Sequence, residues 1–354
     1  LTKIDIPASV TDIGTGVFAS CTKLESINVN EANPNYISVD GALYTKDMSS
    51  LIGYPIGKTD VSEFTVPDGV KDIGSNVFEL SSLTKVNLPD GLESIGEYAF
   101  ENANITEINL PDSLKSIGKG AFDSCDALTE ITIPKNVTSI EERAFCFCKN
   151  MTSAIILANV TSIENGVFEF CEKLTSVTLP DSITSIKYSA FLCCEELKTI
   201  NMPANLTSIE DAAFSGCDCF ESFEIPKTVT DIEENPFDNC QNLKNLSVET
   251  GNTAFIAEEG VLYTKDKSVL ICFPAGKADE EFSVPAGVSK IENDAFYGCE
   301  NLKSVSVSNG VTSIGEYSFG SCKSLTSIDI PEGVTSIGDS CFYDCEALTS
   351  VTLP

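Results

Sequence analysis

The chain is 354 residues long and strongly acidic, with 53 Asp and Glu residues against 22 Lys and Arg residues and with no His. Its formal net charge of −31 repels phosphate backbones and anionic lipid surfaces, which disfavours nucleic acid and membrane partners. The absence of His excludes Ser-His-Asp and Cys-His catalysis and every His-dependent metal site. No apolar run reaches the roughly 18 residues that a membrane helix needs, and no signal peptide is recognisable in this stretch.

A single sequence unit recurs along the whole chain, about every 23 residues. It reads V-x-x-I-x-x-x-A-F-x-x-C-x-x-L-x-x-I-x-L-P. Its Phe stands at Phe18, Phe78, Phe100, Phe122, Phe145, Phe168, Phe191, Phe214, Phe237, Phe296, Phe319 and Phe342. A unit this short cannot bury its own apolar positions, so copies must stack on one another. Leu1–Pro7 reads as the end of a further unit, so we expect capping and targeting segments outside this stretch.

The last third of each unit, L-x-x-I-x-L, predicts one strand per repeat. Leu128, Ile131 and Ile133 are one example, and their alternation is typical of a strand with one buried face. We therefore predict a single parallel-stranded solenoid domain over residues 1–354, with about 14 units. If its strands form one continuous sheet, that sheet is roughly 70 Å long, at 4.8 Å per strand.

The strand motif is typical of leucine-rich repeats, and the pattern I-G-x-x-A-F-x-x-C at Ile117–Cys125 closely resembles the BspA-like branch of that superfamily. The resemblance covers the whole chain. It implies a right-handed solenoid of α/β type, rich in β structure, with a parallel sheet on one face. The chain departs from the pattern at Ala154, at Leu157 and in the two Cys-free repeats around Phe78 and Phe100.

Two repeats, at about residues 30–67 and 249–285, are longer than the rest and resemble each other. Within them, Asn33–Lys58 and Asn252–Lys277 contain short β-prone runs separated by turn dipeptides, which predicts a small antiparallel meander or hairpin insertion. Tyr44 and its counterpart Tyr263 indicate shared packing. A binding loop is the alternative interpretation.

The fifteen cysteines do not suggest a disulfide framework. Ten share the slot three residues after the repeat Phe, where stacking gives parallel Cβ vectors that suit bridging poorly. We therefore predict a ladder of small buried thiols. The spacings Cys146-x-Cys148 and Cys217-x-Cys219 are the alternative metal motifs, but no His completes them. No metal and no cofactor is expected.

Residues between the two buried positions of each strand point outward and form a short-chained, mostly polar row, which is the candidate binding surface. Its central members are Asn87, Asn109, Thr132, Ile155, Thr178, Asn201 and Glu224. Ile155 departs from the polar pattern. It is either an exposed hot spot or is buried by a local shift in register.

No catalytic residue is expected. Adjacent carboxylates such as Glu141 and Glu142 fall in turns, as do the Gly-x-Gly pairs, which lack the rest of a phosphate loop. BspA-like proteins are typically surface or secreted proteins of host-associated anaerobes and some protists, linked to adhesion. That resemblance implies an extracellular, non-enzymatic scaffold that binds a protein ligand, such as a host matrix protein. A passive stalk that displays another domain, or a carbohydrate-binding module, are the alternatives.

Overall fold

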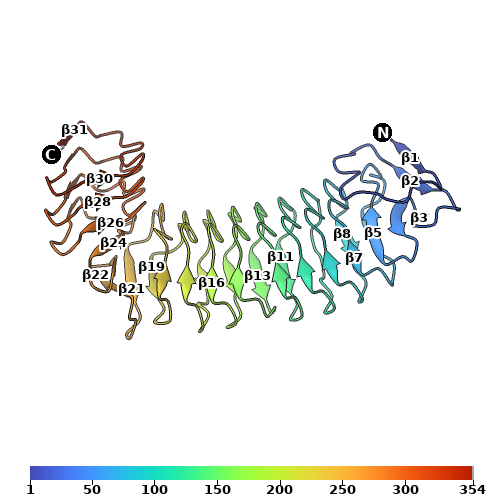
Figure 1. The fold of residues 1–354 in the computed structure, drawn as a ribbon, viewed down its shortest axis with the longest axis horizontal. Helices are drawn as coiled ribbons and strands as arrows, with labels where there is room; N and C mark the ends of the chain where they lie inside the picture. The colour runs from blue at the N-terminus through green and yellow to red at the C-terminus, as the bar shows by residue number, and fades with distance from the viewer. Residues whose placement is uncertain (353–354) are drawn as a thin grey trace. The chain divides into compact units, whose positions relative to one another are not determined.

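The computed structural model describes residues 1–352, and these contain strands and turns but no helix. The chain divides into two compact units. Unit 1 comprises Leu1–Ile183 with Thr199–Asn201, and unit 2 comprises Thr184–Lys198 and the chain from Met202 onward. In each unit, successive repeats form stacked coils (Figure 1). The predicted parallel-stranded solenoid is confirmed, and its description as α/β type is corrected to all-β.

Most ordinary repeats contribute two kinds of strand, whereas the sequence predicts one. The L-x-x-I-x-L motif forms what we call the face strands. They are β1 (Lys3–Ile6), β2 (Ser26–Val29), β6 (Glu63–Thr65), β8 (Lys85–Asn87), β11 (Glu130–Ile133), β13 (Ser153–Ile156), β15 (Ser176–Thr178) and β17 (Thr199–Ile200) in unit 1, and β19 (Ser222–Ile225), β21 (Asn245–Val248), β25 (Glu281–Ser283), β27 (Ser304–Ser306), β29 (Ser327–Asp329) and β31 (Ser350–Thr352) in unit 2.

A second kind of strand is only two residues long. It consists of the Ile that lies five residues before the repeat Phe and the residue before that Ile. These short strands are β7 (Asp72–Ile73), β9 (Ser94–Ile95), β10 (Ser116–Ile117), β12 (Ser139–Ile140) and β14 (Ser162–Ile163) in unit 1, and β16 (Ser185–Ile186), β18 (Ser208–Ile209), β20 (Asp231–Ile232), β26 (Lys290–Ile291), β28 (Ser313–Ile314) and β30 (Ser336–Ile337) in unit 2. They pair in parallel, repeat by repeat, within each unit.

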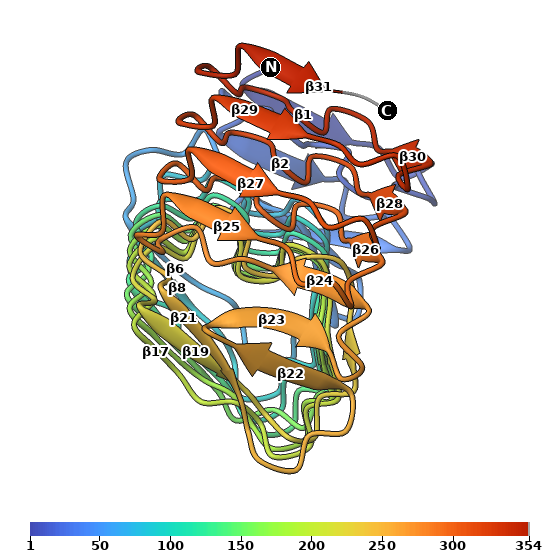
Figure 2. The same ribbon diagram turned by 90° about the vertical axis from the view of Figure 1, so that its left-hand side faces the viewer.

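The face strands do not form one continuous sheet. In unit 1 they pair as β1-β2, β6-β8 and β11-β13-β15-β17. In unit 2 they pair as β19-β21 and as β25-β27-β29-β31, and the second of these groups is seen in Figure 2. Each expanded repeat places its own strands between two of these groups. Where the Cys-free repeats meet, Glu107 pairs with Lys85 only through an isolated bridge. The strand face is therefore interrupted, so the condition for a continuous sheet of roughly 70 Å is not met.

Both expanded repeats contain the predicted antiparallel meander. Its strands are β3 (Tyr36–Val39), β4 (Ala42–Thr45) and β5 (Ser50–Gly53) in unit 1, and β22 (Phe255–Glu258), β23 (Val261–Thr264) and β24 (Val269–Cys272) in unit 2. The last strand of each meander pairs in parallel with the next short strand, β5 with β7 and β24 with β26. Tyr44 and Tyr263 are buried, as their matched positions predict.

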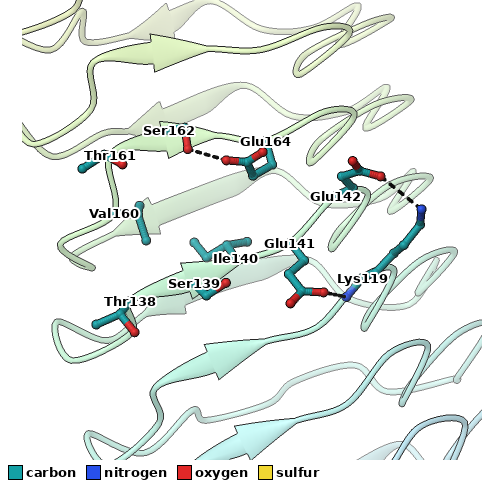
Figure 3. A pocket seen from close by; sticks show the side chains of 10 residues that line it. All are labelled: Lys119, Thr138, Ser139, Ile140, Glu141, Glu142, Val160, Thr161, Ser162 and Glu164. Atoms are coloured by element: carbon teal, nitrogen blue, oxygen red, sulfur yellow. Dashed lines mark hydrogen bonds and ion pairs between the residues drawn. The ribbon is translucent and has the colours of Figure 1, made fainter.

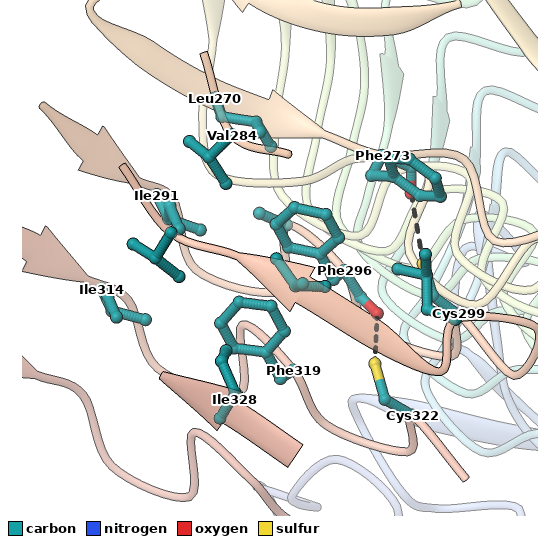
Figure 4. Close-up of a cluster of buried hydrophobic side chains, with 14 of the residues drawn as sticks. Leu270, Phe273, Val284, Ile291, Phe296, Cys299, Ile314, Phe319, Cys322 and Ile328 are labelled. Atoms are coloured by element: carbon teal, nitrogen blue, oxygen red, sulfur yellow. Dashed lines mark hydrogen bonds between the residues drawn. The ribbon is translucent and has the colours of Figure 1, made fainter. Parts of the chain in front are cut away.

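The repeat phenylalanines stack on one another and form the centre of each unit. In unit 1 the rings of Phe100 and Phe122 lie 5.1 Å apart and 5° from parallel. In unit 2, Phe214 lies between Phe191 and Phe237, with ring centroids 5.4 Å and 5.7 Å away. All five rings are fully buried. Figure 4 shows the same arrangement for Phe273, Phe296 and Phe319, with the Ile side chains packed beside them.

The cysteine ladder is confirmed, and its hydrogen bonds explain why Cys suits the slot. All fifteen cysteines are thiols. Most of the ten ladder cysteines donate from Sγ to the carbonyl oxygen of the Phe one repeat earlier, as Cys322 does to Phe296 at 3.2 Å (Figure 4). The bonded pairs are Cys125–Phe100, Cys148–Phe122, Cys171–Phe145, Cys217–Phe191, Cys240–Phe214, Cys299–Phe273, Cys322–Phe296 and Cys345–Phe319. A small apolar group with a weak donor thus fills the space and bonds the carbonyl.

Candidate ligand-binding face

The predicted outward row is best formed on the sheet β11-β13-β15-β17 of unit 1. Thr132, Ile155 and Thr178 stand opposite one another in register on adjacent strands, and all three side chains are exposed. The alternate residues of the same strands, such as Ile131 and Val177, are buried. Alternation along the strand therefore correctly predicts which side chains face outward here.

Ile155 is exposed, so the alternative in which a register shift buries it is wrong. Its side chain is 40% accessible, while Ala154 and Ile156 on either side are buried. The register is unchanged because Ala154 fills the core slot of its neighbours Ile131 and Val177.

Leu157 extends this apolar surface by one further outward position. The slot holds Pro in most repeats, but Leu157 has an N–H, which donates to the carbonyl oxygen of Ile133 at 2.9 Å. Its side chain is 55% accessible. Because residues two apart on a strand share a face, Ile155 and Leu157 form an exposed apolar pair between the threonines of the adjacent strands. We call these two residues the apolar pair.

The other predicted members of the row differ in their roles. Asn201 is exposed, but its side chain bonds twice to the backbone of Leu179, by accepting from the N–H and by donating to the carbonyl oxygen, both at 2.8 Å. It therefore continues the strand pairing that the backbone does not make. Asn87 lies half-buried at the end of β8 and donates to the Thr65 hydroxyl at 3.1 Å, whereas Asn109 is exposed and outside any strand.

Glu224 is exposed on β19, which belongs to unit 2, where it pairs in register with Ser247 of β21. The structure thus brings Thr132, Ile155 and Thr178 together on one sheet. Glu224 lies on a separate sheet.

A polar groove of about 520 Å³ lies beside the short strands β12 and β14 of unit 1 (Figure 3). At Gly118 the neighbouring turns pack tightly, because a Cβ there would lie 2.8 Å from the backbone nitrogen of Glu97. No side chain can therefore line a groove at this position. One repeat later the slot holds Glu141, whose side chain lines the groove.

Two of the three carboxylates that line the groove, those of Glu141 and Glu142, bond to one lysine. The backbone N–H of Lys119 donates to Glu141 Oε2 at 3.0 Å, and its Nζ donates to Glu142 Oε2 at 3.1 Å. The Glu142 hydrogen bond raises the pKa of Lys119. This pairing is what a solvated surface pair of carboxylates makes, and it does not set up an acid–base couple.

Sequence reasoning missed a pair of outward aromatic residues in unit 1. Phe147 and Phe170 stack with centroids 4.7 Å apart, and the Arg143 guanidinium lies 5.7 Å from the Phe147 ring centre. Both residues are half-buried and have left-handed backbone φ, 55° and 57°, which is rare for an aromatic residue. The sequence signal is a second Phe two residues after the repeat Phe, at Phe145-Cys146-Phe147 and Phe168-Glu169-Phe170.

The family model for the BspA type leucine rich repeat region matches residues 1–50, 56–175, 138–259 and 272–354. The chain belongs to this family. Its fold is that of the leucine-rich repeat scaffolds, a class that includes protein-interaction scaffolds. No helix among residues 1–352 is both long and apolar enough to cross a membrane.

Three solved structures of bacterial leucine-rich repeat proteins are similar to this chain. A leucine rich cell surface protein from Faecalibacterium prausnitzii is 28% identical with a TM-score of 0.65, covering 91% of this chain and 89% of that one. A protein from Bacteroides ovatus is 28% identical with a TM-score of 0.59, covering 90% and 85%. One from Eubacterium ventriosum is 29% identical with a TM-score of 0.50, and this match spans 58% of this chain and 60% of that one. No curated protein matches the sequence.

Proposed function

We propose that this chain is a non-enzymatic adhesion scaffold at the cell surface or in the secreted state. It binds a host matrix protein or another cell-surface protein through the outward face of β11–β17. Family membership and similarity to a cell surface protein of F. prausnitzii support the location. The apolar pair supports the choice of face.

The apolar pair carries the proposal because it is an exception within an otherwise polar surface. Its neighbours Thr132 and Thr178 are short and uncharged, so a partner that covers these two positions removes no water from a charged group there. Protein interfaces typically combine a small apolar centre with a polar rim, and a few central residues supply most of the binding energy. The face therefore has the composition of a small protein-binding centre.

The test uses substitutions that the chain itself contains at the same slots. Ile155→Thr copies Thr132 and Thr178. Leu157→Asn copies Asn30, whose N–H makes the same bond, to the carbonyl oxygen of Ile6 at 2.9 Å. We therefore expect the double variant to keep the fold while it removes the apolar pair. Binding to a panel of immobilised matrix proteins and glycans is measured by surface plasmon resonance for this variant and the unaltered protein.

We expect saturable binding to a matrix protein that weakens at least about tenfold in the double variant. The matched control is Leu80→Ser, which removes a 41% accessible leucine at a slot that Ser124 occupies two repeats along, with the same left-handed φ, near 59°. Equal binding by the double variant would place the site elsewhere. Binding to glycans alone would favour a carbohydrate-binding module, and binding to nothing in the panel would favour a passive stalk.

A further inference from the structure

The pairing of short strands in unit 1 has one break that no meander explains. Strand β12 is the last strand of one sheet and β14 belongs to another, although the two strands come from consecutive repeats. The polar groove of about 520 Å³ is lined by residues of both repeats (Figure 3). The groove therefore lies where two strand edges face each other without pairing.

The missing bonds can be identified from the repeat before. There the carbonyl oxygen of Lys115 accepts from the Thr138 N–H at 2.8 Å, and that of Ile117 accepts from the Glu141 N–H at 3.0 Å. The carbonyl groups of Thr138 and Ile140 occupy the same two positions one repeat later. Among residues 1–352, neither of them accepts a backbone hydrogen bond from the next repeat.

The amide groups of β12 show which side of the strand is open. The N–H and C=O of one strand residue point to the same side, and those of the next residue point to the opposite side. Ser139 and Glu141 donate their N–H groups to the previous repeat, at 3.3 Å and 3.0 Å, so both backbone groups of Ile140 point toward the groove. On the facing strand, Ser162 lacks, within the described residues, the bond that Ser208 makes at the same slot, to the repeat before it at 3.1 Å.

The turn that precedes β14 accounts for the open edge. Pro134 begins the turn of the previous repeat, which is closed by the Val137 N–H at 3.2 Å. Leu157 replaces this Pro, and its N–H extends the pairing of the face strand by one residue. In the part of the chain that the structure describes, Val160 then makes no turn-closing bond, and Ala158 is buried where both neighbouring repeats have an exposed residue. The chain thus enters β14 by a different path.

The charges beside the open edge indicate which kind of partner it suits. Glu141, Glu142 and Glu164 line the groove against a single basic residue, Lys119, and the whole chain carries a net charge of −31. The groove volume falls within the range of about 300–1,000 Å³ that is usual for ligand sites. An open strand edge binds an extended backbone, which offers donors and acceptors at the same spacing.

We propose that this groove binds an extended peptide segment of a partner protein. The segment pairs with the free N–H and C=O of Ile140 and the free C=O of Thr138, and it places a Lys or Arg side chain against the carboxylates of Glu141 and Glu164. The site lies on the short-strand side of the repeat. It is therefore separate from the apolar pair and does not rest on the function proposed for the face strands.

The probe is an array of heptapeptides with blocked ends, each with a central Lys flanked by Thr, Val, Ile or Ser. The tightest binder is then measured by calorimetry in about 0.15 M KCl, which screens diffuse attraction to the acidic surface. We expect one saturable site. Replacing the central Lys by Glu, or methylating alternate backbone nitrogens of the peptide, should each weaken binding at least about tenfold.

Glu141→Lys tests the place of binding. It copies Lys187, which holds the same slot two repeats along, and it should weaken binding of the Lys peptide at least about tenfold. The matched control is Glu210→Lys. Glu210 holds the same slot and accepts from the Tyr188 N–H at 3.0 Å, as Glu141 does from Lys119, but its short strand β18 is paired on both sides.

Hydrogen exchange measured by NMR supplies a readout on the strand edge itself. The peptide should slow exchange of the Ile140 N–H, and the methylated peptide should not. Absence of saturable binding, equal binding of the methylated peptide, or unchanged exchange at Ile140 would each overturn strand pairing in this groove. Equal loss of binding in Glu141→Lys and Glu210→Lys would show that the peptide responds only to overall charge, which would overturn the site.

Discussion

The aromatic ring of each repeat is the residue on which stacking depends most. Phe214 is fully buried between Phe191 and Phe237, with both neighbouring rings within 6° of parallel, and Phe223 packs at 5.4 Å from its side. Its backbone is also paired, because its N–H donates to the carbonyl oxygen of Pro236 at 2.8 Å. The ring therefore contacts both neighbouring repeats, and removing it affects both.

Phe214→Ala should lower the free energy of unfolding by about 3–5 kcal/mol, from lost burial and from the cavity that rigid neighbouring turns cannot close. Urea unfolding followed by circular dichroism measures the change. The transition must first be shown to be cooperative, since repeat proteins can unfold in parts. A loss below about 1 kcal/mol would contradict the role of the ring in the core.

Residue patterns predict the position of some side chains but not the hydrogen bonds of others. The outward position of Thr132, Ile155 and Thr178 follows from a strand period of two, and the buried Cys slot follows from its place beside the Phe. The bonds that Asn201 makes to the Leu179 backbone do not follow, because a polar residue in an outward slot is equally suited to water. Hydrogen-bond partners between repeats depend on side-chain conformation, which the repeat pattern leaves open.

Among the elements, the meanders contain one turn whose chemistry is repeated in both copies. In the second copy, Asp266 Oδ1 accepts from the Ser268 N–H at 3.0 Å, the Ser268 hydroxyl at 2.7 Å and the Thr264 hydroxyl at 2.8 Å. These bonds, led by the Ser268 N–H, lower the pKa of Asp266 to about 2, and Asp47 in the first copy is lowered likewise. The ionised carboxylate thus holds together the turn between β23 and β24.

The meander turn should lose stability in acid because of this carboxylate. A pKa that is lower in the folded state than the unfolded value of about 3.9 stabilises the turn above that value, and the contribution is lost as the pH falls through about 2. Hydrogen exchange of the peptide that covers residues 264–272 should therefore show falling protection between about pH 4 and pH 2, after correction for the intrinsic rate.

Asp266→Asn provides the control, since an amide does not titrate in this range. Its protection should be lower than that of the unaltered protein near neutral pH and should lack the acid-dependent part. An identical pH dependence in both proteins would show that other groups control the stability of this turn.

The sequence does not predict the short strands because they are too short to show a pattern. Each consists of two residues, such as Ser116–Ile117, and two residues cannot display a periodicity. Their pairing becomes visible only once coils stack, when Ser116 meets Ser94 on one side and Ser139 on the other. The meanders, with longer runs and turn dipeptides, were predictable in type.

At the scale of the molecule, an excess of negative charge acts against the stacked state. With 53 acidic and 22 basic residues, stacking brings like charges together that the unfolded chain keeps apart. Many of the basic residues offset part of this repulsion by forming an ion pair with an acidic residue one repeat away. Lys85 pairs with Glu107 at 2.6 Å, and Lys323 pairs with Glu300 at 2.6 Å. Such exposed pairs are weak individually, so a net repulsion remains.

Salt should therefore stabilise the protein. The urea midpoint is expected to rise as KCl increases from about 0.05 M to about 0.5 M, because the Debye length shortens from roughly 14 Å to roughly 4 Å. The titration is carried out in EDTA, so that divalent ions play no part. A midpoint that falls with KCl would mean that the attractive pairs outweigh the repulsion.

The family and the repeat architecture were predictable from the sequence, because many copies agree on the same buried positions. The interruption of the strand face and the open edge of β12 were not. Residues 138–140 and 161–163 both read Thr-Ser-Ile, as in repeats whose short strands do pair, and their separation depends on the path of the turn at Leu157. That residues 1–354 fold as one domain stays a prediction.

The two meanders are attached to their neighbouring repeats by the same contacts. Asn33 Nδ2 donates to the carbonyl oxygens of Pro7 and Val10 at 2.9 Å, and Asn252 Nδ2 donates to those of Pro226 and Val229 at 3.0 Å and 2.9 Å.

At the other end, Gly57 and Gly276 each donate an N–H to a leucine carbonyl one coil earlier, at 2.8 Å and 2.9 Å. Each meander also pairs its last strand with the next short strand and buries Tyr44 or Tyr263, so a replacement must supply these contacts as well as the end contacts. We therefore expect residues 33–58 and 252–277 to be exchangeable with each other while the surrounding coils keep their register.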